Sequence, residues 1–135
     1  MIWQKEYPGV PHHLHVNSSF ASVTPACDAD RVYVAWSDPD FTRLMALDHA
    51  GKEVWTINLG PWISQHGFGC SPMLYQDLVV LNCSQEDSKR KDDPKPTASF
   101  IVAVEQSTGK IRWRTDRKID SASYSVPTIR KDDKG

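Results

Sequence analysis

The chain of 135 residues is long enough for one small domain, and 39% hydrophobic with 24% charged residues excludes a disordered or collagen-like chain. The net charge of −1 excludes the electrostatic footprint of a protein that binds nucleic acid or an anionic membrane surface. No apolar run in the sequence has the length of a transmembrane helix, and the amino-terminal residues lack the layout of a signal peptide.

In chain order, short runs rich in Val, Ile, Tyr and Trp alternate with turns of Asp, Gly, Pro and Ser, which is the pattern of β-strands. No window has a sustained helical period, so we expect an all-β fold. The expected strands are Ser22–Asp28, Arg31–Ser37, Thr42–Asp48 and Glu53–Leu59, then Gly69–Tyr75, Leu78–Ser84, Ser99–Glu105 and Ile111–Arg117, and a last strand within Ser125–Arg130.

The two sets of four strands repeat one another. Residues Ala46–Trp55 recur in similar form as Ala103–Trp113. Pro25, Pro72 and Pro127 occupy equivalent positions in three successive repeats. A repeat at this period indicates stacked units that share a core. Four-stranded antiparallel units stacked face to face are the blades of a β-propeller, so we expect a partial propeller.

The prolines agree with this architecture. If Gln76 and Asp77 form a two-residue turn, Pro72 lies opposite Leu81 with its ring nitrogen facing away from the second strand. Proline is tolerated in a sheet only where no hydrogen-bonding partner is needed, and the innermost strand of a blade has such a free edge.

The repeat resembles the pyrroloquinoline-quinone-like (PQQ-like) propeller family, whose blade signature is Ala-x-Asp-x-x-Thr-Gly-Lys-x-x-Trp. The acid of the signature can cap the turn between the third and fourth strands, the glycine can take a positive φ, and the tryptophan can fill the gap between blades. Trp3 resembles the last signature residue of a preceding blade. The signature residues are Ala46, Asp48, Gly51 and Trp55 in the first copy and Ala103, Glu105, Gly109 and Trp113 in the second.

The resemblance implies a ring of about seven or eight blades, of which this chain holds a part. We expect the chain to be a segment of a longer protein and favour this over several copies that complete a ring together. The expected units are the end of a preceding blade with its loop (Met1–Phe20), a blade (Ala21–Gly60), a second blade (Pro61–Arg117) with an inserted charged loop (Ser84–Ala98), and the start of a third blade (Lys118–Gly135).

Chemistry is expected on the rim that carries the loops between second and third strands and between successive blades. Histidine and aspartate side chains gather there, so a metal site is conceivable. Nothing in their spacing fixes a ligand geometry, and we favour hydrogen-bonded or solvated loop residues. The candidates are His12, His15, His66, Asp38 and Asp40.

Three cysteines allow one pair. With the same two-residue turn, Cys70 and Cys83 face each other at about 4.5 Å between Cα atoms, at the short end of the range for a disulfide. We favour two buried thiols over a bond between them. Cys27 has no visible partner, so we expect it to be a buried free thiol.

Three functions remain open. The favoured one is a non-catalytic scaffold for binding or protein assembly, as the resemblance to cofactor-free propellers of bacterial cell envelopes implies. The others are a segment of a PQQ-dependent dehydrogenase and the sensor domain of a larger signalling protein. Quinone enzymes of this family hold calcium with Glu, Asn and Asp and have a disulfide between adjacent cysteines, and the sequence has no matching pattern.

The same resemblance sets the expected cofactors and partners. No cofactor is expected, except PQQ with calcium under the dehydrogenase reading. The expected partners are the remaining blades or other copies of the chain, and a protein on the loop face. The family implies an extracytoplasmic or cell-envelope location.

Overall fold

The structure is a computed structural model that describes residues 2–11, 14–19, 22–64, 66–86, 98–119 and 121–131. These residues form two four-stranded antiparallel sheets, ordered β1-β2-β3-β4 and β5-β6-β7-β8, and no helix lies in the described ranges. The strands are β1 (Ala26–Cys27), β2 (Arg31–Asp38), β3 (Phe41–Asp48), β4 (Glu53–Asn58), β5 (Met73–Tyr75), β6 (Leu78–Cys83), β7 (Ser99–Glu105) and β8 (Ile111–Arg117).

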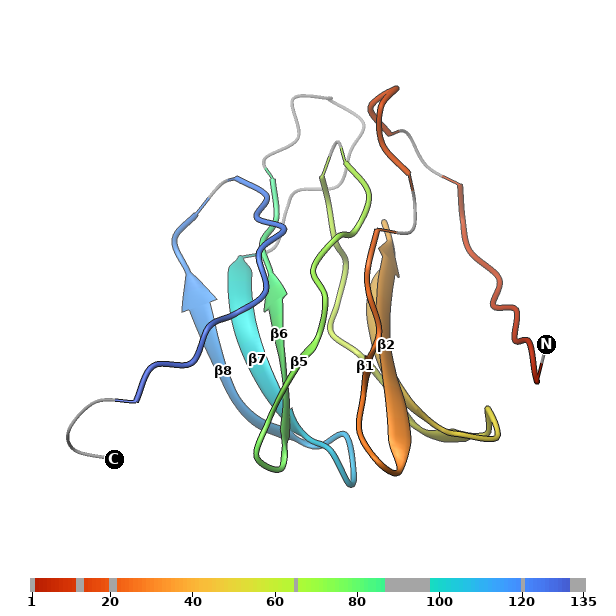
Figure 1. Ribbon diagram of the computed structural model, residues 1–135. Helices are drawn as coiled ribbons and strands as arrows, with labels where there is room; N and C mark the ends of the chain where they lie inside the picture. Colours follow the sequence, from red (N-terminus) through yellow and green to blue (C-terminus); the bar gives the residue numbers. More distant parts are fainter. Residues whose placement is uncertain are drawn as a thin grey trace.

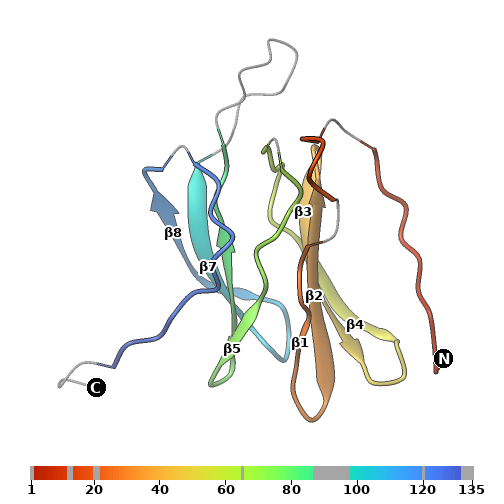
Figure 2. The ribbon, with the colours of Figure 1, turned by 45° about the horizontal axis from the view of Figure 1, so that its top comes forward.

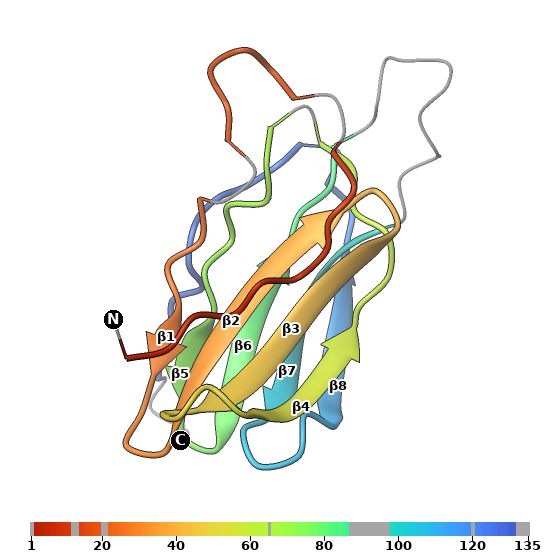
Figure 3. The same cartoon turned by 90° about the vertical axis from the view of Figure 1, so that its right-hand side faces the viewer.

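The two sheets stand face to face (Figure 1), with β1 and β5 at one edge of the pair and β4 and β8 at the other (Figure 3). The β2–β3 turn and the connection from β4 to β5 lie at one end of the sheets, at the top of Figure 1. The β1–β2, β3–β4, β5–β6 and β7–β8 turns lie at the opposite end. The first and last described segments lie on opposite flanks of the two sheets, as Figure 2 also shows. The expected architecture of stacked four-stranded blades is therefore confirmed.

The register of the second sheet follows from its first turn. Met73 pairs with Val80 and Tyr75 with Leu78, which leaves Gln76 and Asp77 as the two-residue turn that the sequence predicts. Gln76 takes a positive φ of 53° to close this turn. Both sheets also carry a bulge at the same place of the repeat, after Ala46 and after Ala103.

The inner strands differ from expectation. β1 has two residues and β5 has three, whereas the sequence predicts seven in each, and residues 125–130 form no strand. A strand at the inner edge has a hydrogen-bonding neighbour on one side only, so its length is set by that single partner. The described pairing begins directly after Pro25 and Pro72, and no described strand pairs with the segment around Pro127.

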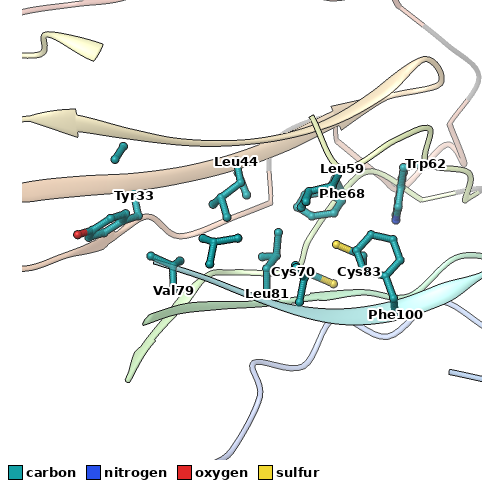
Figure 4. Close-up of a cluster of buried hydrophobic side chains, with 14 of the residues drawn as sticks. Tyr33, Leu44, Leu59, Trp62, Phe68, Cys70, Val79, Leu81, Cys83 and Phe100 are labelled. Carbon is teal, nitrogen blue, oxygen red and sulfur yellow. The ribbon is translucent and has the colours of Figure 1, made fainter. Parts of the chain in front are cut away.

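The core lies between the two sheets, with a lid formed by the connection from β4 to β5 (Figure 4). β6 is buried on both of its faces, as the apolar run Leu78–Leu81 predicts. In the lid, the rings of Trp62 and Phe68 meet edge to face with centroids 5.3 Å apart. The core cluster consists of Tyr33, Ala35, Leu44, Ala46, Trp55, Leu59, Trp62, Phe68, Cys70, Val79, Leu81, Cys83, Phe100, Val102 and Val104.

The signature tryptophan joins one blade to the next. The ring of Trp55 lies against Gly109, where an added Cβ would be 2.7 Å from the ring, and its indole N–H donates to the carbonyl of Gln106 at 2.8 Å. The ring of Trp3 likewise lies against Gly51, where an added Cβ would be 2.7 Å from that ring. Both glycines have positive φ, as predicted. Trp113 is 42% exposed because no described turn lies against it.

The signature acids cap their turns as predicted. Oδ1 of Asp48 accepts the backbone N–H groups of Ala50 and Lys52 at 2.9 and 2.8 Å. Glu105 holds the longer turn differently, since its carboxylate accepts the hydroxyl of Thr108 at 2.8 Å. Glutamate therefore replaces aspartate where the turn is one residue longer.

All three cysteines are free thiols in the structure. Cys70 and Cys83 are buried in the core, and the preference for two thiols over a disulfide stays a prediction. The expectation for Cys27 was wrong, because this residue is exposed. Cys27 pairs with Val32 and therefore shares the face of the first sheet that points away from the second sheet and from the core.

Candidate functional site

An open cleft of about 840 Å³ lies at the inner edge of the two blades, and we call it the inner cleft. Three segments line it, and each precedes an inner proline. Ser22, Gly69 and Tyr124 stand three residues before Pro25, Pro72 and Pro127, so the repeat brings equivalent positions to one wall. The lining residues are Val16, Asn17, Ser18, Ser19, Ser22, His66, Gly67, Gly69, Ser71 and Tyr124.

Gly69 allows the third segment to approach the second. A Cβ at this position would lie 2.7 Å from Cδ1 of Tyr124, so the tyrosine ring rests directly on the glycine backbone. The neighbouring inner segments are also joined, because the backbone N–H of Thr24 donates to Oγ of Ser71 at 3.0 Å. The wall of the inner cleft is thus built by contacts between successive repeats.

His66 is held from two sides. Its Nδ1 lies 2.8 Å from Oγ of Ser18, and its backbone N–H donates to Oγ of Ser64 at 3.1 Å. The ring centroid of His15 lies 5.3 Å away and that of Tyr124 lies 6.2 Å away. Among the described residues no hydrogen bond joins His66 to a carboxylate, so this serine–histidine pair lacks the third group that would orient the imidazole as a base.

Ser64 links the lid to the second and third repeats. Its hydroxyl donates to Oε2 of Glu86 at 2.6 Å and lies 3.3 Å from the hydroxyl of Tyr124. Partial burial raises the pKa of Tyr124, Glu86 acts in the same direction, and the bond to Ser64 opposes both. Below them, Sγ of Cys70 donates to the carbonyl of Ser123 at 2.8 Å. This network fixes the tyrosine at the edge of the inner cleft.

The metal candidates are brought together only in part. His15 and His66 meet, and His12 lies outside the described residues. Oδ1 of Asp38 accepts the N–H groups of Asp40 and Phe41 at 2.9 and 3.1 Å, so this oxygen stabilises the β2–β3 turn. Within the described ranges, no group of three His, Cys, Asp or Glu residues is arranged to hold a metal ion.

Sequence reasoning missed Ser18, Ser64 and Tyr124 as site residues. Their partners are 48 and 60 residues away in the chain, so no local motif contains them. The signal available was the alignment on the inner prolines, which places Ser22, Gly69 and Tyr124 at one level. Applied to the residues before each proline, this alignment would have found the wall of the cleft.

Solved structures with a similar fold are known. A europium-containing methanol dehydrogenase aligns with a TM-score of 0.54 and 18% identity, covering 69% of this chain and 15% of that chain. A quinohemoprotein alcohol dehydrogenase from Comamonas testosteroni aligns with a TM-score of 0.50 and 26% identity, covering 68% and 12%. The chain has the fold of a PQQ-like β-propeller.

BamB from Moraxella catarrhalis also aligns with this partial propeller, with a TM-score of 0.42 and 17% identity, covering 88% of this chain and 43% of that chain. The propeller segment therefore spans less than half of each of these proteins. No family profile matches the sequence, and no curated protein matches it. The described residues contain no helix that is long and apolar enough to cross a membrane.

The residues of the inner cleft do not fit calcium and an anionic quinone. Calcium takes six to eight oxygen ligands and prefers carboxylates, whereas the lining residues include neither Asp nor Glu. They also include neither Lys nor Arg to pair with the anionic groups of a quinone. These described residues alone would leave both charges uncompensated.

Proposed function

We propose that the chain is a segment of a non-catalytic PQQ-like propeller that serves as a scaffold for binding or protein assembly. The observation that carries this proposal is the chemistry of the inner cleft. Its wall consists of serine hydroxyls, the side chains of Val16 and Asn17, two aromatic rings and glycine backbone, and the serine–histidine pair has no described acid behind it. Such a wall supplies shape and hydrogen bonds, which suffice for binding, and it lacks the paired titratable groups of an active site.

A second candidate is a segment of a PQQ-dependent dehydrogenase. The 26% identity to a quinohemoprotein alcohol dehydrogenase favours it. In that case other blades would supply the calcium ligands and the cations for the quinone, because the described wall does not. The two functions thus differ in whether the whole protein binds the quinone.

Under the scaffold proposal, the partners are the remaining blades on the flanks and a protein on the loop rim. The flank of β8 offers Ile111 and Trp113, which are 47% and 42% exposed, and exposed apolar groups of this kind favour association. The proposed location is the cell envelope, in keeping with the resemblance to envelope propellers.

The decisive experiment adds PQQ and calcium to the whole protein. We expect no saturable change in quinone absorption and no dye-linked oxidation of methanol or ethanol, because the described cleft lacks the necessary charges. Dye reduction that requires both PQQ and calcium would overturn the scaffold proposal and establish the dehydrogenase.

A second measurement tests scaffolding directly. A photoreactive amino acid replaces the exposed Asp40 in the β2–β3 turn or, as a control, the exposed Ser107 in the β7–β8 turn. These two turns lie at opposite ends of the sheets. We expect a discrete cross-linked protein adduct from position 40 in cells and none from position 107. Adducts of the same proteins from both positions would contradict a partner on the rim.

A further inference from the structure

We propose that the inner cleft binds a neutral saccharide of about disaccharide size through Ser18, Ser22, Ser71 and Tyr124. This inference rests on the proposed function, because it takes the inner cleft as a binding site and not as a reaction site. The volume of about 840 Å³ lies within the range of about 300 to 1,000 Å³ that small-molecule sites occupy.

The absence of charged side chains from the described lining favours an uncharged ligand. The lining residues include no Asp, Glu, Lys or Arg, and His66 is bound to Ser18 at its Nδ1. A ligand carboxylate or phosphate would enter without a cationic partner, and an ammonium group would enter without a carboxylate. Removing such a charge from water without a partner is unfavourable, so a neutral polar ligand fits this wall best.

The serine hydroxyls that line the cleft can form further hydrogen bonds. Within the described part of the chain, Oγ of Ser18 bonds only to His66, Oγ of Ser22 only to Ser19 at 3.3 Å, and Oγ of Ser71 only to the N–H of Thr24. A serine hydroxyl is one donor and two acceptors, so each retains hydrogen-bonding capacity for a ligand. Sugar hydroxyls likewise both donate and accept, and they match a wall of this kind.

Tyr124 supplies an apolar surface beside these hydroxyls. Its ring is fixed by the backbone of Gly69 and by the bond to Ser64, yet the residue is 42% exposed. An aromatic ring next to a few placed polar groups is the usual make-up of a small-ligand site. The C–H face of a sugar ring can pack on this ring while the hydroxyls reach the serines.

The inner edges argue against a peptide as the ligand. An extended peptide binds a sheet edge by adding a strand, and this needs backbone N–H groups along that edge. Pro25 and Pro72 remove an N–H from the inner segments at equivalent positions. The same prolines leave the side-chain hydroxyls untouched, so side-chain recognition of a saccharide remains.

Titration of the full chain with cellobiose tests the inference. We expect saturable binding by calorimetry, together with shifts of the Tyr124 and His66 ring signals in NMR spectra. Ser71→Ala and Tyr124→Ala should each weaken binding several-fold, because each removes one contact to the ligand. Ser107→Ala removes an exposed serine in the β7–β8 turn, outside the lining of the inner cleft, and should leave the affinity unchanged. Ser18→Ala serves as a second cleft variant if the thermal melt of Ser71→Ala shows lost folding.

Two further probes separate the alternatives. Digalacturonate has the size of cellobiose but two negative charges, and a Ser-Gly-Thr-Gly peptide that is acetylated and amidated at its ends is uncharged and offers backbone hydrogen bonds. We expect both to bind at least about tenfold more weakly than cellobiose. Equal or tighter binding of either probe, cellobiose affinity that the cleft variants leave unchanged, or no saturable cellobiose binding would overturn the inference. Those results leave the scaffold proposal standing, whereas PQQ-dependent dye reduction overturns the scaffold proposal itself.

Discussion

At the scale of single residues, Asp28 organises the first turn of the first blade. Oδ1 accepts the backbone N–H groups of Asp30 and Arg31, both at 2.8 Å, and Oδ2 accepts the hydroxyl of Tyr33 at 2.8 Å. Burial by itself would raise the pKa of Asp28, but these hydrogen bonds together lower it. Burial and the same carboxylate raise the pKa of Tyr33 to about 12.

The lowered pKa of Asp28 predicts a pH dependence of stability. Because the folded value lies below the unfolded value of about 3.9, the stabilisation is present above that pH and is lost as the pH falls through the folded value. Asp28→Asn should therefore lose less stability on acidification, as measured by urea unfolding at a series of acidic pH values. The exposed Asp30→Asn is the matched control, and parallel curves for Asp28→Asn and the wild type would contradict the assignment.

The three thiols should differ in reactivity. Burial raises the pKa of Cys70 to about 11 and raises that of Cys83 further, whereas Cys27 is exposed. A thiol reagent at mildly alkaline pH should label one cysteine per folded chain, and all three should react after unfolding. Cys27→Ser should abolish the labelling of the folded chain. If only Cys27 reacts after unfolding without reductant, a bond between Cys70 and Cys83 exists.

At the scale of the elements, the contact of tryptophan with glycine decides how one blade holds the next. Gly109 combines a φ of 72° with a ring of Trp55 at its α-carbon, and Trp55 is only 9% exposed. Gly51 holds Trp3, which is 38% exposed and so less tightly enclosed. The contact between Trp55 and Gly109, which joins the two described blades, should therefore contribute more to the free energy of unfolding than the contact between Trp3 and Gly51.

Gly109→Ala should destabilise the chain by about 1 to 3 kcal/mol from backbone strain, and by more once the displaced indole is included. Gly60→Ala is a sharp control, because Gly60 has a φ of 100° but open space around its α-carbon. Thermal or urea unfolding should give the order Gly109→Ala, then Gly51→Ala, then Gly60→Ala. Equal losses at Gly109 and Gly60 would show that the indole contact contributes nothing.

At the scale of the whole molecule, the flanks of the blade pair remain apolar. Ile111 and Trp113 on β8 and Val126 and Ile129 in the last segment are 42 to 47% exposed. In a propeller each flat face of a blade is covered by its neighbour, so these side chains favour association when no neighbour is present.

The 135-residue chain alone should therefore associate in a concentration-dependent manner in analytical ultracentrifugation. Trp113→Ser combined with Ile111→Thr should reduce this association, because the pair lies on one exposed strand. Val16→Thr changes an 89% exposed valine in a loop and should have no such effect. A monodisperse monomer at all concentrations would contradict the prediction.

Most of the fold could be predicted because residues close together in the sequence determine the strands and turns. The short runs rich in Val, Ile, Tyr and Trp between turn residues predict the strands, and the two-residue turn at Gln76 and Asp77 sets the register of β5 and β6. The extents of β1 and β5 could not be predicted, because an edge strand takes its length from its partners. The exposure of Cys27 depended likewise on which face of β1 a neighbour covers.

The sequence by itself determined the repeat, the strands, the positive φ of Gly51 and Gly109 and the turn-capping acids, since each is encoded by residues close together in the chain. Only the tertiary structure decided the inner cleft. Its contacts join Ser18 to His66, Ser64 to Tyr124 and Cys70 to Ser123, which are 48, 60 and 53 residues apart. Such pairs meet because stacked blades bring equivalent positions to one wall, and no local pattern contains that proximity.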